Sequence, residues 1–138
     1  MLGIQVSVDA ADPQALASFW AEALGYVEQP PPEGFASWDA FADQVGIPPE
    51  RRGDITALVD PDGLGPRLLF QRVPEPKTAK NRLHLDLAVS GPDHDRSLVA
   101  AHVERLVAAG GTVVGERSGA GEHWVVMADP EGNELCLQ

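Results

Sequence analysis

The sequence predicts an α+β fold made of two tandem copies of one βαβββ module. The first observation is a repeat: ITALVDPDGLGPRLLFQ at residues 55–71 and WVVMADPEGNELCLQ at residues 124–138 share one pattern. Each contains an apolar strand, an Asp-Pro-acid-Gly turn and a second apolar strand ending in Gln. Asp60 and Asp129 begin the two turns and are separated by half the length of the chain. A repeat with this period indicates a duplicated structural unit.

The second observation concerns the start of each copy. Residues 4–26 and 83–114 both have the pattern of a strand, a turn with Pro and Asp, and a helix that ends at glycine. Two units of about 70 residues would each be marginally stable alone, so we expect them to share one core. We therefore predict a single domain over residues 1–138, with a first module of about residues 1–75 and a second of about residues 81–138.

In the first module, alternation of apolar residues such as Ile4 with polar ones predicts a strand over residues 2–9. Asp12 is a typical helix N-cap, Pro13 suits the first helical position, and Gly25 is a typical helix end. The remaining predicted elements are a short strand at residues 26–29, a short helix at 37–45, and strands at 55–59 and 67–73.

In the second module, Leu83, Leu85 and Leu87 alternate with polar residues and predict a strand over residues 83–89. A helix is predicted over residues 95–109, with its buried stripe formed by Val99, Val103, Leu106 and Val107. His94 and His102, in this helix and its approach, are expected at the surface. Three further strands are predicted at residues 112–116, 123–127 and 134–138.

The segment between residues 30 and 54 has no counterpart in the second module and carries the aromatic residues Trp38 and Phe41. Such an insertion in one copy has two interpretations. It either covers a binding site or extends the core as a structural flap.

Composition excludes some classes of function. The formal net charge is −11, and no basic stripe is present, so nucleic acid is not an expected partner. No apolar run reaches the roughly 18 residues of a membrane span, and the first residues lack the pattern of a signal peptide, so we expect a cytoplasmic protein that does not bind membranes. Cys136 is the single cysteine and cannot form an internal disulfide.

If each helix covers the apolar side of its strands, the opposite sides face solvent or a cavity. On these sides, His84 and Asp86 are two residues apart on one strand, close enough for the carboxylate to influence the imidazole. This pair is interpreted either as a general base or ligand anchor, or as a strand histidine bonded to its neighbour. The sides that we expect to converge carry Gln5, Ser7, Asp9, Leu69, Gln71, His84, Asp86, Cys136 and Gln138.

Cys136 is expected to be a small buried residue rather than a nucleophile, because no neighbouring cation or helix N-terminus in the sequence would lower its pKa. Trp38 and Trp124 are candidates for the walls of a ligand pocket, although a strand tryptophan such as Trp124 is equally typical of a core. No phosphate-binding loop or HExxH pattern is present in the sequence.

Three segments together resemble the vicinal oxygen chelate superfamily, in particular its glyoxalase-like members: VDAADPQALASFWAEALGY at residues 8–26, VDPDGLGPRLLFQRVPEPKTAKNRLHLDL at 59–87, and HWVVMADPEGNELCLQ at 123–138. The resemblance implies a paired βαβββ fold that curves into a partly closed barrel around one cavity. Members include glyoxalases, extradiol dioxygenases, epimerases, fosfomycin-modifying enzymes and bleomycin-binding proteins, so the fold leaves the function open.

The resemblance also implies where metal ligands would lie in this chain: Gln5, either Leu69 or Gln71, His84 and Cys136. Only His84 is a typical ligand of the superfamily, and Cys136 stands where a carboxylate is expected. Glu134 would replace it only if a bulge turned the last strand. We therefore expect no cofactor and no usual divalent metal site, with a softer ion bound by His84, Cys136, Gln5 and Gln71 as the alternative.

The first functional hypothesis is a homodimeric protein that binds a small molecule in the cavity, against Gln5, Gln71, Trp38, Trp124 and Cys136 beside the His84 and Asp86 pair. The second is a lyase or isomerase, glyoxalase-type or dioxygenase-related, that uses His84 as a base or as a metal ligand. The third is a dimerising or regulatory domain without a ligand.

Overall fold

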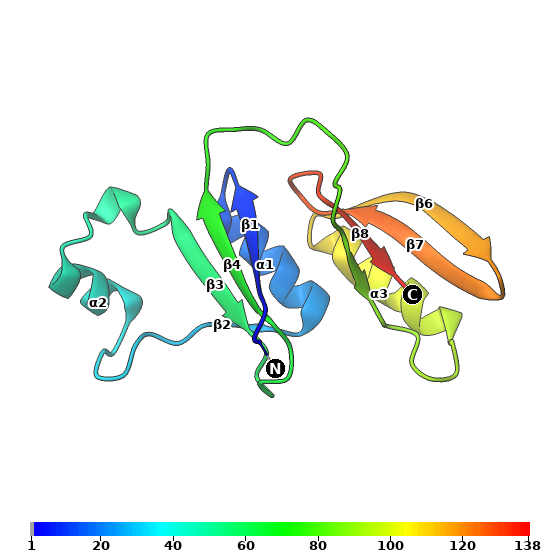
Figure 1. The fold of residues 1–138 in the computed structure, drawn as a ribbon, viewed down its shortest axis with the longest axis horizontal. Coiled ribbons are helices and arrows are strands. Elements are labelled where there is room, and N and C mark those ends of the chain that lie inside the picture. Colours follow the sequence, from blue (N-terminus) through cyan, green and yellow to red (C-terminus); the bar gives the residue numbers. More distant parts are fainter. Residues whose placement is uncertain (1) are drawn as a thin grey trace.

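The structure is a computed structural model that describes residues 2–138. It confirms the α+β class and the two βαβββ modules (Figure 1). The first module contains β1 (Gln5–Ala10), α1 (Pro13–Leu24), β2 (Val27–Glu28), α2 (Trp38–Val45), a short 3₁₀ helix (Pro49–Arg51), β3 (Ile55–Val59) and β4 (Arg67–Arg72). The second contains β5 (Leu85–Leu87), α3 (Arg96–Ala108), β6 (Thr112–Gly119), β7 (Glu122–Ala128) and β8 (Glu134–Leu137).

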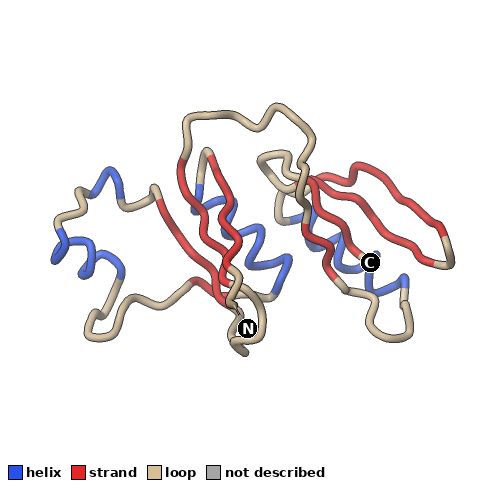
Figure 2. The backbone as a smooth tube through the Cα atoms, in the orientation of Figure 1, coloured by secondary structure: helices blue, strands red, loops and turns tan. Residues whose placement is uncertain are grey.

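The two sheets have equivalent strand orders, β1-β4-β3-β2 and β5-β8-β7-β6. In each sheet the first strand runs parallel to the last, and the other pairs are antiparallel. The equivalence confirms the duplication predicted from the repeat. The sheets lie side by side, with both long helices behind them and the linker between modules crossing at one end (Figure 2). Within residues 2–138 no backbone ladder joins one sheet to the other.

Helix α1 forms where its sequence signals predict it. The side chain of Asp12 accepts a hydrogen bond from the backbone N–H of Ala15, Pro13 occupies the first turn, and Gly25 ends the helix at φ 69°. A left-handed φ of this kind strongly favours glycine. The residues that α1 buries lie on one face, and this face packs on β3 and β4: Pro13, Leu16, Ala17, Phe19, Trp20 and Ala23.

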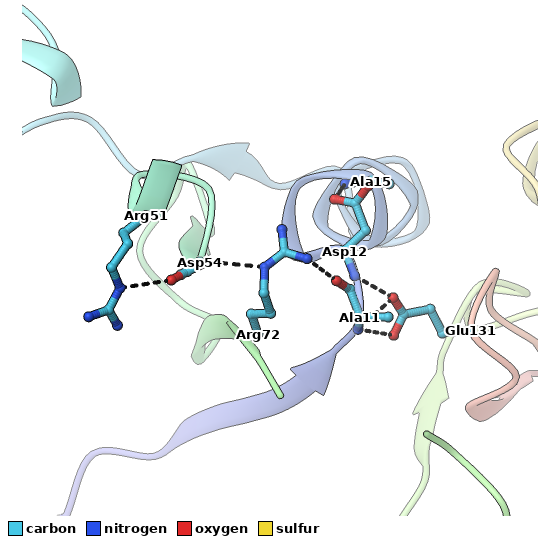
Figure 3. A network of polar contacts seen from close by, with 7 residues as sticks. All are labelled: Ala11, Asp12, Ala15, Arg51, Asp54, Arg72 and Glu131. Atoms are coloured by element: carbon cyan, nitrogen blue, oxygen red, sulfur yellow. Dashed lines mark hydrogen bonds and ion pairs between the residues drawn. The ribbon is translucent and has the colours of Figure 1, made fainter. Parts of the chain in front are cut away.

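One hydrophobic core spans both modules, as expected for halves too small to be stable alone. Helices α1 and α3 contact each other, and polar contacts reinforce the junction. The carboxylate of Glu131, in the turn before β8, accepts hydrogen bonds from the backbone N–H groups of Ala11 and Asp12 at 2.8–3.0 Å (Figure 3). None of the helices in residues 2–138 is both long and apolar enough to cross a membrane.

The prediction that His102 lies at the surface is wrong. Its ring is only 9% exposed and Nε2 lies 2.9 Å from the carbonyl oxygen of Ala23, because α3 packs this part of its surface against the end of α1. Val107 lies on the other side of α3 and is 48% exposed, although the apolar periodicity predicted it in the stripe. The periodicity could not identify the side that α1 covers.

Two apolar strand residues that alternation placed inside are also exposed. Ile4 and Leu83 precede the first hydrogen-bonded residues of β1 and β5, and they are 75% and 90% exposed. The strand predicted over residues 83–89 is paired only over Leu85–Leu87. Alternation gives the side on which a residue lies, but burial requires a second layer opposite it.

Candidate functional site

Strand alternation places the second module's polar side chains on the sheet face opposite the helices. On β5 and β8 the leucines point into the core, since Leu87, Leu135 and Leu137 are all less than 10% exposed. Asp86 and Cys136 are direct partners in the parallel β5–β8 ladder, so both must project from the other face. His84, two residues before Asp86, shares that face.

These three side chains form a compact group. The ring Nδ1 of His84 lies 2.9 Å from Oδ1 of Asp86, and each side chain is 44% exposed. One potential ligand atom from each of His84, Asp86 and Cys136 lies within 4.8 Å of the others. Because a carboxylate can only accept, a neutral His84 donates from Nδ1–H, which leaves Nε2 as a free acceptor. The predicted His84 and Asp86 pair is therefore present, together with the thiol.

Cys136 lies at the less exposed side of this group. Burial raises the pKa of its thiol above the ordinary value, and the negative charge of Asp86 raises the pKa further. Both effects stabilise the protonated thiol. The chemistry of this environment is consistent with our expectation that Cys136 is not an activated nucleophile.

Glu134 needs no bulge to share the face of Cys136, because the β7–β8 ladder is regular through both residues. Its carboxylate nevertheless has other partners: it accepts a 3.0 Å hydrogen bond from the backbone N–H of Asn81 and pairs with Lys77 at 3.2 Å. The hydrogen bond from Asn81 is the main cause that lowers the pKa of Glu134, and Lys77 makes a smaller contribution in the same direction. This carboxylate anchors the end of the linker between modules.

Trp124 lies on β7, on the face shared by Val126 and Cys136, and is half-buried. The predicted site residues of the first module form separate contacts. The amide of Gln71 donates to Asp9 at 2.8 Å, and the indole Nε1 of Trp38 donates to the carbonyl oxygen of Gln29 at 2.7 Å. The side chains of Gln71 and Trp38 therefore bond to partners within the first module.

Gln5 has a partner that sequence reasoning missed. Its side-chain oxygen accepts a 2.6 Å hydrogen bond from Nη1 of Arg67, and Nε of Arg67 donates to the Gln29 side chain, also at 2.6 Å. Arg67 stands directly across from Gln5 in the β1–β4 ladder. The sequence signal that could have identified Arg67 was its position at the start of the predicted strand that carries Gln71.

The seven predicted site residues thus fall into two sets. His84, Asp86, Cys136 and Trp124 lie on the second sheet, whereas Gln5, Gln71 and Trp38 belong to the first module. Across residues 2–138, no side-chain hydrogen bond or ion pair joins the two sets.

The donor set of the second sheet decides which metal it suits. Imidazole, carboxylate and thiol are ligands of a borderline-soft ion such as Zn²⁺, whereas Mg²⁺ or Mn²⁺ favours carboxylates, carbonyls and water. The thiol, whose pKa is raised, would also have to lose its proton on binding. The residues present therefore fit a hard divalent ion poorly. The family resemblance also implied Gln5 and Gln71 as ligands, and their side chains bond to Arg67 and Asp9.

Solved structures show where this fold occurs. The chain is similar to a mutant of the fosfomycin resistance protein FosX from Listeria monocytogenes, solved with Mn(II) and 1S,2S-dihydroxypropylphosphonic acid, with a TM-score of 0.66 and 11% identity over 100% of this chain and 90% of that one. It is also similar to a glyoxalase-related enzyme from Fulvimarina pelagi, with a TM-score of 0.62 and 20% identity over 99% and 87% of the chains.

A third similar structure is the bleomycin-binding protein of Streptomyces verticillus in complex with copper(II)-bleomycin. Its TM-score is 0.55 at 19% identity, over 100% of this chain and 95% of that one. At these identities the similarity establishes the fold alone, and the neighbours include both enzymes and binding proteins. No curated protein matches the chain.

The family model of the glyoxalase-like domain matches residues 5–138, which is nearly the whole chain. This match agrees with the paired βαβββ topology and with the family resemblance in the sequence. The chain belongs to the glyoxalase-like domain family of the vicinal oxygen chelate superfamily.

Proposed function

We propose that this protein binds a small molecule on the sheet face of the second module, against His84, Asp86 and Cys136, without the divalent metal site usual in its superfamily. The observation that carries the proposal is the 2.9 Å contact between Nδ1 of His84 and Oδ1 of Asp86, beside the thiol of Cys136. It supplies a hydrogen-bond acceptor at Nε2, a carboxylate and a thiol donor on one accessible face.

These groups can orient a polar ligand, while half-buried Trp124 on the same sheet offers apolar contact area. A ligand long enough to reach the first module would also meet Gln5, Gln71 and Trp38. Binding proteins of this fold are known, since one of the similar structures is a bleomycin-binding protein. The proposed cytoplasmic location rests on the sequence alone.

Metal analysis tests the proposal. Purified protein is measured for bound metal before and after treatment with a chelator, and native mass spectrometry detects a small molecule that co-purifies. We expect no stoichiometric metal and a retained organic ligand whose amount falls in the variant His84→Ala. A full equivalent of tightly bound metal that is lost in His84→Ala would overturn the metal-free binder. A protein that retains no organic ligand and no metal would favour a regulatory domain.

A second candidate function is a lyase or isomerase, which the orientation of His84 favours. Asp86 holds Nδ1, so Nε2 is available to accept a proton from a carbon next to a carbonyl group. Deuterium incorporation into hydroxyacetone in D₂O, followed by NMR, tests this activity. Exchange that is lost in both His84→Ala and Asp86→Asn would support the enzyme over the binder.

A further inference from the structure

Arg67 is the one cation of the first sheet whose side-chain partners are neutral. Two of its nitrogens donate to the side-chain oxygens of Gln5 and Gln29, each at 2.6 Å. Within residues 2–138 it forms no ion pair, although the chain carries a net charge of −11. Within residues 2–138, Nη2 and the second N–H of Nη1 have no hydrogen-bond partner, so the guanidinium keeps unused donors.

Arg67 lines a hollow of about 890 Å³ between the inserted segment and the edge of the first sheet. Trp38 and Phe41 of α2 form an aromatic wall, with ring centroids 5.8 Å apart in a T-shaped arrangement. Trp38 remains 38% exposed and α2 buries only Ala42, so the insertion does not extend the core. Helix α2 of the insertion lies apart from the strands of the first sheet (Figure 1).

The wall and the cation are connected through one residue. The backbone carbonyl of Gln29 accepts from the indole of Trp38, and the side-chain oxygen of Gln29 accepts from Arg67. The two bonds fix an apolar surface and a positive charge on either side of Gln29. A ligand that enters the hollow therefore meets both.

The other arginines around the hollow already have carboxylate partners. Arg51 pairs with Asp54 at 3.2 Å, and Arg52 pairs with Asp39 and Asp43. Glu28 also borders the hollow. Its partner in the β2–β3 ladder is Leu58, which is buried on the helix side of the sheet, so Glu28 projects from the face opposite Arg67. Arg67 is therefore the arginine of this lining that no carboxylate pairs with, and it lies on the sheet face opposite Glu28.

We propose that this hollow binds a small organic carboxylate with an aromatic or apolar body, its carboxylate on the free end of Arg67 and its body against Trp38 and Phe41. A planar guanidinium matches a carboxylate with two hydrogen bonds, and such charge-assisted bonds are about twice as strong as neutral ones. The inference goes beyond the proposed function, because all the residues that carry it belong to the first module and none lies on the sheet of His84.

The probe for the test is 2-naphthoate, with the neutral 2-naphthamide as its matched partner, each titrated by calorimetry. We expect saturable binding of 2-naphthoate that weakens with added salt, and at least about tenfold weaker binding of the amide. Arg67→Gln should lose roughly 10–100-fold in affinity for the carboxylate and become indifferent to the difference between the two probes. Arg51→Gln, which removes a compensated arginine of the same rim, should bind 2-naphthoate as the parent protein does.

Arg67→Lys keeps the positive charge but lacks the planar guanidinium that donates two hydrogen bonds. Thermal melting followed by circular dichroism shows whether each variant is still folded. Equal binding of naphthoate and naphthamide by the parent protein, or full affinity in a folded Arg67→Gln variant, would overturn the inference. His84→Ala distinguishes the two sites. This variant should bind 2-naphthoate as the parent protein does, even if it no longer retains the ligand proposed for the second sheet. The proposal for each site can therefore be contradicted independently of the other.

Discussion

The indole Nε1 of Trp20, in the helix of the first module, donates a 3.0 Å hydrogen bond to the buried carboxylate of Asp129, in the last turn of the second module. The same carboxylate accepts from the backbone N–H groups of Glu131 and Asn133 and from the Asn133 side chain. One buried acid thus closes its own turn and joins the two halves. Within residues 2–138, the side chain of Asp60, its counterpart in the first repeat, accepts hydrogen bonds only from N–H groups of its own turn.

Asp129→Ala should destabilise the fold more than Asp60→Ala. The first change leaves the buried Trp20 N–H and the turn without an acceptor and should cost about 2–4 kcal/mol, whereas water can replace the carboxylate of Asp60 at a smaller cost. Urea denaturation of the two variants measures the difference. Equal losses would mean that the bond across the modules contributes nothing beyond the turn itself.

Glu131 should stabilise the junction in a way that its counterpart does not. Its carboxylate accepts from the backbone of Ala11 and Asp12, so Glu131→Ala should cost about 2 kcal/mol and Glu131→Gln about half as much, since one acceptor remains. Asp62, at the same position of the first turn, makes no side-chain hydrogen bond within residues 2–138, and Asp62→Ala is the matched control. Thermal melting of all three variants gives the order, and a control as unstable as Glu131→Ala would contradict it.

Cys136 should react slowly with iodoacetamide near neutral pH, because burial and the charge of Asp86 raise the pKa of its thiol. Asp86→Asn removes the second cause, so the pKa should fall and alkylation at a fixed alkaline pH should become faster. As Cys136 is the single cysteine, mass spectrometry of the intact chain reads the rate without ambiguity. An unchanged rate in folded Asp86→Asn would leave burial as the sole cause.

His102 should make the stability fall in mild acid. Burial lowers its pKa, and the nearby charge of Arg105 acts in the same direction, so the unfolded chain binds the proton more readily. The resulting stability is complete above the ordinary histidine value of about 6.5 and is lost as the pH falls through it. Between about pH 7.5 and 5.5 the free energy of unfolding should decrease, and less so in His102→Gln. His94→Asn, at an exposed position of positive φ, is the control and should keep the full pH dependence.

The homodimer stays a prediction. Light scattering coupled to size exclusion should give a mass of twice the 14.7 kDa of one chain. The mass of a single chain at every concentration measured would contradict it.

Much of the fold could be predicted from local chemistry. Alternation gives the face of each strand, the Asp12, Pro13 and Gly25 signals delimit α1, and the repeated Asp-Pro-acid-Gly turn indicates the duplication. The same alternation placed His84 and Asp86 on one face, where Nδ1 of His84 lies 2.9 Å from Oδ1 of Asp86. These features depend on neighbours in sequence, which periodicity can describe.

The sequence by itself therefore determined the modules, the strand faces and the His84 and Asp86 pair. Only the tertiary structure decided which side of α3 is buried, why His102 rather than Val107 lies inside, and which side chains close the junction. It also decided that Arg67 and Trp38 line one hollow and that Gln29 bonds to both of them. The physical reason is that these contacts join residues far apart in the chain, and their geometry depends on how whole layers pack rather than on any local period.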